Sequence, residues 1–248
     1  MKDLFSEQSA GYAAFRPVYP TSLYDFIYSL VPSTESAWDC GTGNGQVARQ
    51  LAEHFNEVYA TDISEKQLSV AVQKPNIRYS CQPAESTNFS QAQFDLIVVA
   101  QAIHWFDFEK FYAEVRRTIK PEGVLAVVGY GVLNTNGKLN DIVDHFYRTT
   151  IGSFWDPERK HIDEHYKNIP FPFEEIKTPV LSMRYEWSLD HLLGYLSTWS
   201  AVQHYKKANG HDPVQLIAND VKANWGDAPL RAFEFPVISR VAIMPKAK

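Results

Sequence analysis

A carboxylate and three glycines stand close together at residues 39–45, where the sequence reads Asp-Cys-Gly-Thr-Gly-Asn-Gly. An apolar run ends at Asp39 and an amphipathic segment begins directly after Gly45, so the pattern predicts a strand, a tight loop and a helix. Glycine admits positive φ and lets a ligand approach the backbone without a Cβ atom in the way. The N-terminus of the following helix offers free N–H donors. The stretch therefore predicts a pocket for a nucleotide-like molecule, although a tight turn without a ligand would use the same glycines.

Asp62 is a second carboxylate that ends an apolar run, Val58–Thr61. In doubly wound folds an acid in this position accepts hydrogen bonds from the hydroxyl groups of a ribose. Capping of the next helix is a competing role, but Ser64 and Gln67 already supply a capping box there. We therefore expect Asp62 to contact a ribose.

Further polar residues follow two later runs that read as strands, 77–81 and 94–100. The second run is continuously apolar, which is typical of a strand buried on both faces of a parallel sheet. Ligands of such sheets lie beyond the carboxyl ends of the strands, so the polar residues within 101–106 are candidates for the site. His104 would serve as general base if the reaction removes a proton from a hydroxyl or an amine. A purely structural hydrogen-bonding role for this histidine is the alternative.

These residues need a scaffold that brings strand ends together. Strands alternate with amphipathic segments over 36–130, which indicates right-handed crossovers and a parallel sheet. Pro20 opens a helix before the first strand, and residues 1–33 form an N-terminal arm. The alternation breaks over 131–178, an aromatic-rich stretch that suits a lid or, alternatively, a packing subdomain. Residues 179–248 return to strands and helices, and the length favours a single domain.

The composition argues against several classes of function. The chain has 248 residues, a net charge of −5 and no run of lysine or arginine. This charge argues against general electrostatic binding to nucleic acid. Cys40 and Cys81 form no CxxC pair, so neither a zinc ribbon nor a disulfide scaffold is expected. The H-x-x-E-H pattern at 161–165 is a zinc-peptidase motif, but nothing marks a third ligand and we expect no metal. No stretch reads as a membrane span or a secretion signal, which predicts a soluble, cytoplasmic protein.

The loop at 39–45 resembles the D-x-G-x-G-x-G signature of class I S-adenosylmethionine-dependent methyltransferases. The dinucleotide-binding fingerprint would instead need its third glycine one residue later. Over about residues 36–130 the chain resembles the methyltransferase type 11 domain in the order and spacing of further elements: Asp62, Ala84-Glu85, 94–100 and 120–123. The segments 16–20 and 102–107 are similar to the trans-aconitate methyltransferase-like branch of small-molecule enzymes.

This resemblance implies a Rossmann-like, doubly wound α/β fold with a seven-stranded, mostly parallel sheet whose last strands run antiparallel. It also implies S-adenosyl-L-methionine as the cofactor. In the family, the turn that corresponds to residues 84 and 85 holds the adenine. The residues expected to bind the cofactor are Tyr12, Arg16, Asp39, Gly41, Gly43, Asp62, Ile63, Ala84, Glu85, Gln101 and Trp105.

The function predicted is methyl transfer to a small molecule, at carboxylate or hydroxyl oxygen. Such a reaction depends on alignment of the two reactants and exclusion of water, not on a covalent nucleophile. A carboxylate acceptor would need no base, and Arg16 or Arg184 would orient it. We expect a monomer or homodimer with no nucleic-acid or membrane partner. A nucleotide-dependent oxidoreductase and a non-catalytic S-adenosylmethionine-binding protein are the rival classes.

Overall fold

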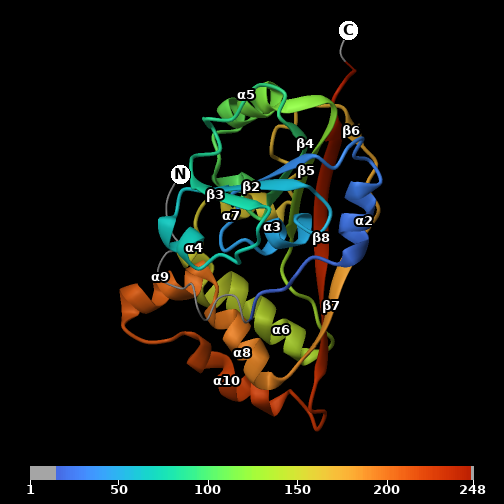
Figure 1. Ribbon diagram of the computed structural model, residues 1–248. Helices are drawn as coiled ribbons and strands as arrows, with labels where there is room; N and C mark the ends of the chain where they lie inside the picture. Colours follow the sequence, from blue (N-terminus) through green and yellow to red (C-terminus); the bar gives the residue numbers. More distant parts are fainter. Residues whose placement is uncertain (1–14, 247–248) are drawn as a thin grey trace.

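The computed structural model describes residues 15–246, and its centre is one mixed β-sheet (Figure 1). Among these residues the sheet has eight strands, in the order β3-β2-β1-β4-β5-β8-β6, with β7 paired to β8. The strands that pair in parallel are β1 Ser36–Cys40, β2 Glu57–Asp62, β3 Ile77–Cys81, β4 Phe94–Ala100 and β5 Ile119–Tyr130. Their carboxyl ends therefore lie along one edge of the sheet. The predicted α/β fold with a mostly parallel sheet is confirmed.

β8 (Arg231–Ile243) is a long strand that runs through both halves of the molecule (Figure 1). Its second half pairs antiparallel with β5, as the sequence predicts. Its first half pairs antiparallel with β7 (Ser182–Trp187), and β6 (Glu175–Ile176) pairs with it near the C-terminal end. The sheet has eight strands where seven were predicted, because β8 is long enough to hold β6 and β7 as separate partners.

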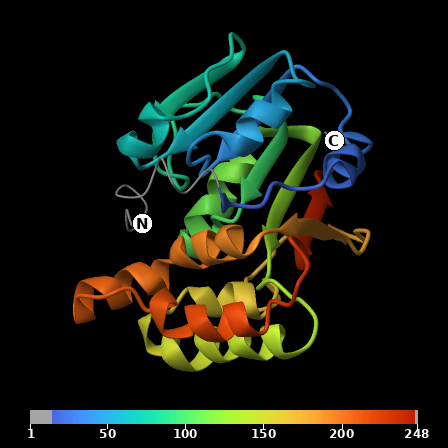
Figure 2. The same cartoon turned by 90° about the horizontal axis from the view of Figure 1, so that it is seen from below.

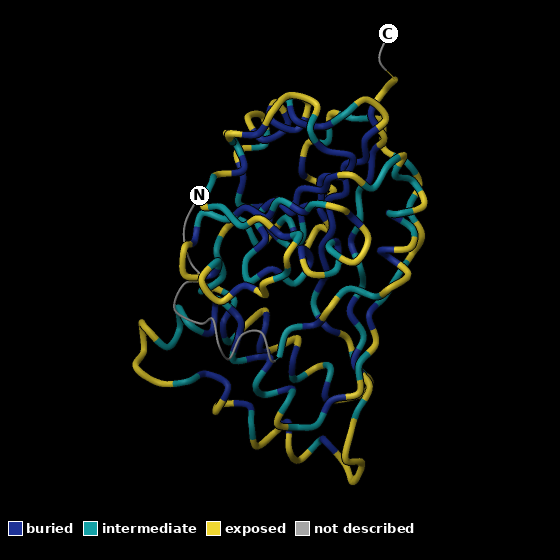
Figure 3. Tube along the Cα trace, in the orientation of Figure 1, coloured by how far each residue is buried: buried dark blue, intermediate teal, exposed yellow. Residues whose placement is uncertain are grey.

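Helices cover both faces of the sheet, and the alternation of side chains along each strand decides which helix they meet. Ile97 and Val99 of β4 share a hydrophobic core with α5. Leu96 and Val98 point to the opposite face and share a core with α2 and α3. The central strands are dark blue in Figure 3 because both of their faces are buried. The helices around the sheet are α2 Thr21–Tyr28, α3 Gln46–Leu51, α4 Glu65–Ser69 and α5 Phe108–Thr118.

A second group of helices lies beyond the carboxyl edge of the sheet (Figures 1 and 2). This helical layer has its own aromatic core, which includes Phe146, Trp187, Trp199 and Phe235. Its elements are α6 Lys138–His145, the π-helical turn η2 Phe146–Thr150, η3 Gly152–Phe154, α8 Leu189–Ser197, α9 Ser200–Asn209 and α10 Val214–Ala223.

The segment predicted as a lid, 131–178, does not pack as one unit. Its first part, through η3, belongs to the helical layer together with α8, α9 and α10. Its second part contains α7 (Arg159–Asp163), and Ile162 and Tyr166 pack into the core on the α5 face of the sheet. The insertion is divided because the apolar side chains of its two parts pack into different hydrophobic cores.

Two boundaries have local causes. β5 continues through residues 120–123, where Glu122 adopts a left-handed conformation with φ 61° beside a register shift against β4. Such a bulge lets a strand continue. α8 begins after its capping residue Ser188, and a separate helix, α9, follows and ends before Gly210 (φ 75°).

Asp95 in β4 is a buried carboxylate that ties three segments together. Its side chain is 2% exposed and accepts a hydrogen bond from Ser36 N at 2.9 Å. It also accepts from Lys120 Nζ at 2.9 and 3.1 Å, which links β4 to β5. A buried charge that loses its partner costs far more than an exposed one.

We expect Lys120→Met to destabilise the fold by about 1–3 kcal/mol, because Asp95 would stay buried without its charged partner. Urea denaturation followed by circular dichroism measures the change. Lys110→Met is the matched control: the Lys110–Asp107 pair is 71% and 45% exposed, so the expected loss is only ~0–1 kcal/mol. Equal effects of the two substitutions would contradict this role of Lys120.

Candidate functional site

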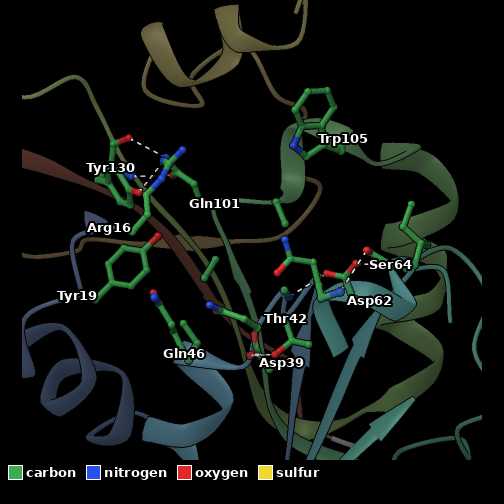
Figure 4. A pocket seen from close by; sticks show the side chains of 18 of the residues that line it. Arg16, Tyr19, Asp39, Thr42, Gln46, Asp62, Ser64, Gln101, Trp105 and Tyr130 are labelled. Atoms are coloured by element: carbon green, nitrogen blue, oxygen red, sulfur yellow. Dashed lines mark hydrogen bonds between the residues drawn. The ribbon is translucent and has the colours of Figure 1, made fainter. Parts of the chain in front are cut away.

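A cavity opens at the carboxyl edge of the sheet, between the N-terminal arm, the glycine loop and the ends of β2, β4 and β5 (Figure 4). The fold thus brings together residues from segments that are far apart in the chain. The predicted site residues that line this cavity are Arg16, Asp39, Gly41, Gly43, Asp62, Ile63, Gln101 and Trp105.

The glycine loop follows β1 and forms the floor of the cavity. Gly41 has φ 73°, and a Cβ atom there would lie 2.7 Å from Ala102 Cβ, so no other residue fits without a shift. Gly41 N and Thr42 N both donate to Thr61 O at 2.9 Å, which ties the loop to the end of β2. The backbone is therefore left open to a ligand at Gly43, where φ is 56° and the space beside the residue is empty.

Asp39 is a buried carboxylate with one oxygen in use and the other without a partner. Only 1% of the surface of this residue is exposed to solvent. Its Oδ2 accepts from Thr42 Oγ1 at 2.5 Å and from Ala48 N at 2.8 Å. Oδ1 has no hydrogen-bond partner among the described residues. Buried acceptors are almost always satisfied, so this oxygen indicates a donor on a bound ligand.

Burial also sets the charge of Asp39. Removal from water raises the pKa of the carboxyl group to about 7, against the lowering effect of the hydrogen bonds from Thr42 and Ala48, and the nearby Asp62 carboxylate raises it further. Asp39 is therefore poised between its neutral and ionised forms near neutral pH. A positively charged donor on a ligand would select the ionised form.

Asp62 ends β2 and faces the same cavity. Its Oδ2 accepts from Gly43 N at 2.8 Å and its Oδ1 accepts from Ser64 N at 2.9 Å. Ser64 caps α4 by accepting from Gln67 N at 3.3 Å, as predicted. Asp62 therefore holds the glycine loop and the residue that caps α4, while Ser64 itself does the capping. The predicted ribose contact of Asp62 stays a prediction.

Gln101 follows β4 in a strained conformation. Its φ is 54°, in a region that costs a residue other than glycine roughly 1–3 kcal/mol. Two hydrogen bonds hold it there: Tyr130 N donates to Oε1 at 2.9 Å, and Nε2 donates to Tyr130 O at 3.2 Å. These two hydrogen bonds also hold Tyr130, at the end of β5, beside the cavity.

Arg16 connects the arm to the helical layer. Its Nη1 donates to the Tyr130 hydroxyl at 3.1 Å and its Nη2 to Thr198 O at 3.1 Å. The guanidinium also lies 5.9 Å from the centre of the Tyr195 ring. Arg16 therefore occupies the wall of the cavity that faces away from Asp62 (Figure 4).

The N-terminal arm also supplies Tyr19 to the lining, as its aromatic character suggests. Several lining residues were missed, and Tyr130 is the most informative of them because it carries a hydroxyl group beside the cavity. Tyr130 could have been found by the rule that selected Gln101, since it also ends a parallel strand. Thr42, Gln46 and Ser64 lie next to predicted residues in the sequence and line the cavity as well.

Two predicted cofactor residues, Ala84 and Glu85, do not line the cavity among the described residues. A third, Tyr12, lies outside the described residues. Ala84 is 3% exposed and packs in the core beneath α5. Glu85 accepts a hydrogen bond from Asp107 N at 3.0 Å, at the start of α5, so its carboxylate is engaged with the backbone there. Their proposed contact with adenine stays a prediction.

His104 is not positioned as the sequence suggested. It lies in the short 3-10 turn η1 (Ile103–Trp105), is 6% exposed and does not line the cavity. Its Nδ1 is 3.5 Å from the Tyr166 hydroxyl. Burial lowers the pKa of the imidazole to about 3, with a smaller effect of Arg159. A buried, weakly basic imidazole outside the cavity fits the structural alternative, and we withdraw the base assignment.

The H-x-x-E-H pattern does not form a metal site. α7 ends at Asp163, and His165 has a left-handed φ of 54°, so His161 and His165 do not share a helical face. His161 Nδ1 instead lies 2.7 Å from Asn168 Oδ1. Residues 15–246 contain no group of three or more metal-binding side chains. Nor does any helix in this range combine the length and apolar character of a membrane span.

Known proteins share both the sequence and the fold. A family model described as a methyltransferase domain matches residues 38–127. A Dictyostelium discoideum protein named as a methyltransferase is 34% identical over 243 residues, which cover 95% of this chain and 92% of that protein. A solved structure from Anaeromyxobacter dehalogenans, titled as a type II methyltransferase, is 37% identical with a TM-score of 0.86, and the match covers 94% of this chain and 100% of that one.

A more distant structure shares the fold alone. It is a phosphoethanolamine N-methyltransferase from Haemonchus contortus in complex with S-adenosylhomocysteine, 16% identical with a TM-score of 0.51. The match covers 98% of this chain and 60% of that one. The near full-length similarity and the glycine loop between two cavity-lining carboxylates lead to one conclusion: the chain belongs to the class I S-adenosylmethionine-dependent methyltransferases.

Proposed function

We propose that the enzyme binds S-adenosylmethionine in this cavity and transfers its methyl group to a small molecule, at carboxylate or hydroxyl oxygen. The observation that carries the proposal is the pair of carboxylates, Asp39 and Asp62, on one wall of the cavity. The cofactor carries a cationic ammonium group and two ribose hydroxyls, which are the donors that such a wall requires. The similarity to the trans-aconitate methyltransferase-like branch stays a prediction.

Each charged group that lines the cavity is assigned a partner on the cofactor. We assign the ribose hydroxyls to Asp62 and the ammonium group to the unpartnered Oδ1 of Asp39. Arg16, on the opposite wall, suits the carboxylate of the methionine part. Gly41 and Gly43 leave the backbone accessible to the cofactor. Ile63, Gln101 and Trp105 complete the contacts, and Tyr12 remains a predicted contact from outside the described residues.

The cofactor supplies a methyl group on a positively charged sulfur. The chain aligns the two reactants and excludes water from the site. Holding two reactants at near-attack distance can remove ~7–11 kcal/mol of a barrier without any group that bonds to the substrate. The aromatic side chains of Tyr19, Trp105, Phe106 and Tyr130 line the cavity and limit the access of water. With His104 outside the cavity, this positioning is the whole catalytic contribution that we assign to the chain.

The remaining features of the proposal come from charge and composition. The net charge of −5 and the carboxylate wall favour a small acceptor over nucleic acid. We propose a cytoplasmic location and a monomeric or homodimeric state. An NAD(P)-dependent oxidoreductase would bind its own cofactor in place of S-adenosylmethionine, so ligand binding separates the two classes.

Asp62→Ala should weaken the binding of S-adenosylhomocysteine at least about tenfold, because it removes a charged acceptor from the ribose hydroxyls. Isothermal titration calorimetry measures the affinity. Asp25→Ala, an exposed acid on α2, is the matched control and should leave the affinity unchanged. A loss below threefold, or binding of NAD(P) by the wild type, would count against the assignment.

The affinity for S-adenosylhomocysteine should rise with pH between 6 and 7. Burial raises the pKa of free Asp39 to about 7, and the ligand ammonium group binds the ionised form. That form grows from about one tenth to about half of the protein over this range, so the affinity should increase about fivefold. Binding at pH 6 should also release nearly one proton, which calorimetry in buffers of different ionisation enthalpy detects. Asp39→Asn, which does not titrate, should remove both effects; if it keeps them, Asp39 is not their source.

A further inference from the structure

The hydroxyl group of Tyr19 is buried beside the cavity and has no partner within the described part of the chain. Tyr19 lines the cavity from the N-terminal arm, just before α2. Its hydroxyl oxygen is out of contact with solvent and makes no hydrogen bond among the described residues. Burial raises the pKa of this phenol well above its usual value, so the hydroxyl keeps its proton. An unsatisfied donor at this place indicates an acceptor on a ligand.

A second tyrosine packs against it. The ring centroids of Tyr19 and Tyr130 are 6.0 Å apart, and the ring planes meet at 64°. The Tyr130 oxygen accepts a hydrogen bond from Arg16, so its own proton is available for donation. Gln101 adds little to this wall, because both ends of its amide bond the backbone of Tyr130.

We call one side of the cavity the donor wall, because its side chains offer hydrogen-bond donors to a ligand. It is formed by Arg16, Tyr19, Gln101 and Tyr130. Figure 4 shows these side chains together on one side, with Asp39, Thr42, Asp62 and Ser64 on the other. Among the described lining residues, both carboxylates belong to the opposite wall. A guanidinium and two hydroxyl donors without a carboxylate beside them suit an anionic oxygen.

We propose that Tyr19 and Tyr130 form the acceptor subsite of the enzyme, in which their hydroxyl groups hold a carboxylate of the methyl acceptor. This inference rests on the proposed function, since it divides the same cavity between two reactants. Arg16 serves the carboxylate of the cofactor and polarises Tyr130, whereas Tyr19 has no role toward the cofactor. The two tyrosines are specificity-determining residues that select acceptors with a carboxylate over neutral molecules of the same shape.

Tyr19→Phe tests the subsite because it removes only the unpartnered hydroxyl. The free protein should keep or slightly raise its melting temperature, since a buried unsatisfied group costs stability. Tyr28→Phe is the matched control: the Tyr28 hydroxyl donates to Gln50 O at 3.3 Å and does not line the cavity.

The ligands for the test are simple carboxylic acids: aliphatic mono- and dicarboxylates of three to eight carbons and benzoate, each with its primary amide as the neutral counterpart. Calorimetry follows their binding to wild-type, Tyr19→Phe and Tyr28→Phe proteins that are saturated with S-adenosylhomocysteine. We expect at least one acid to bind the wild type and its amide not to bind. Tyr19→Phe should weaken that acid about tenfold and leave S-adenosylhomocysteine within twofold.

The possible failures are distinguishable. If S-adenosylhomocysteine does not bind the wild type, the proposed function itself is wrong. If it binds but no acid of the series does, or the amides bind equally well, the subsite is refuted and the methyltransferase assignment stands. If Tyr19→Phe weakens S-adenosylhomocysteine tenfold and leaves acid binding unchanged, the hydroxyl serves the cofactor and our division of the cavity is overturned.

Discussion

The parallel register of β1 between β2 and β4 is the constraint on which the rest of the site depends. Asp39 pairs with Ala60 on one side and with Val98 on the other, so the three strands end side by side. The residues after each strand therefore face one crevice. The glycine loop is held at the same level because Gly41 donates to Thr61 at the end of β2. A slip of one residue would turn every side chain of β1 to the opposite face.

The cavity keeps polar groups in states that a purely structural core would avoid. Among residues 15–246, the buried Asp39 has one oxygen without a partner and the buried Tyr19 has a hydroxyl without one, both beside the same cavity. Gln101 adds a left-handed backbone. Each of these features costs stability in the free protein, and in the proposed function groups of the two reactants would satisfy Asp39 and Tyr19. Stability elsewhere comes from satisfied buried pairs such as Asp95–Lys120, far along the strands from this edge.

The two walls of the cavity are built in different ways. The carboxylate wall comes from a nearly continuous stretch, in which Asp39 and Asp62 lie at the carboxyl ends of two neighbouring strands, Asp39 one residue before the end of β1. The donor wall draws on the arm and the end of β5, and Arg16 reaches Thr198 across 182 positions of the chain. The helical layer thereby contributes to the position of Arg16 without supplying a lining residue among those described.

The sequence by itself determined the parallel sheet, the glycine loop and the position of Asp62, because strand alternation, glycine spacing and strand ends are local patterns. It favoured a ribose contact for Asp62 over capping of the next helix; the structure shows that Ser64 caps α4 and that Asp62 accepts hydrogen bonds from Gly43 N and Ser64 N. It could not place His104, since burial outside the cavity depends on how Tyr166, from a distant segment, packs against it. Nor could it pair Tyr19 with Tyr130, because long-range packing brings their rings together on one wall of the cavity. Only the tertiary structure decides which polar groups remain unsatisfied, because satisfaction depends on every neighbour in space and not on neighbours along the chain.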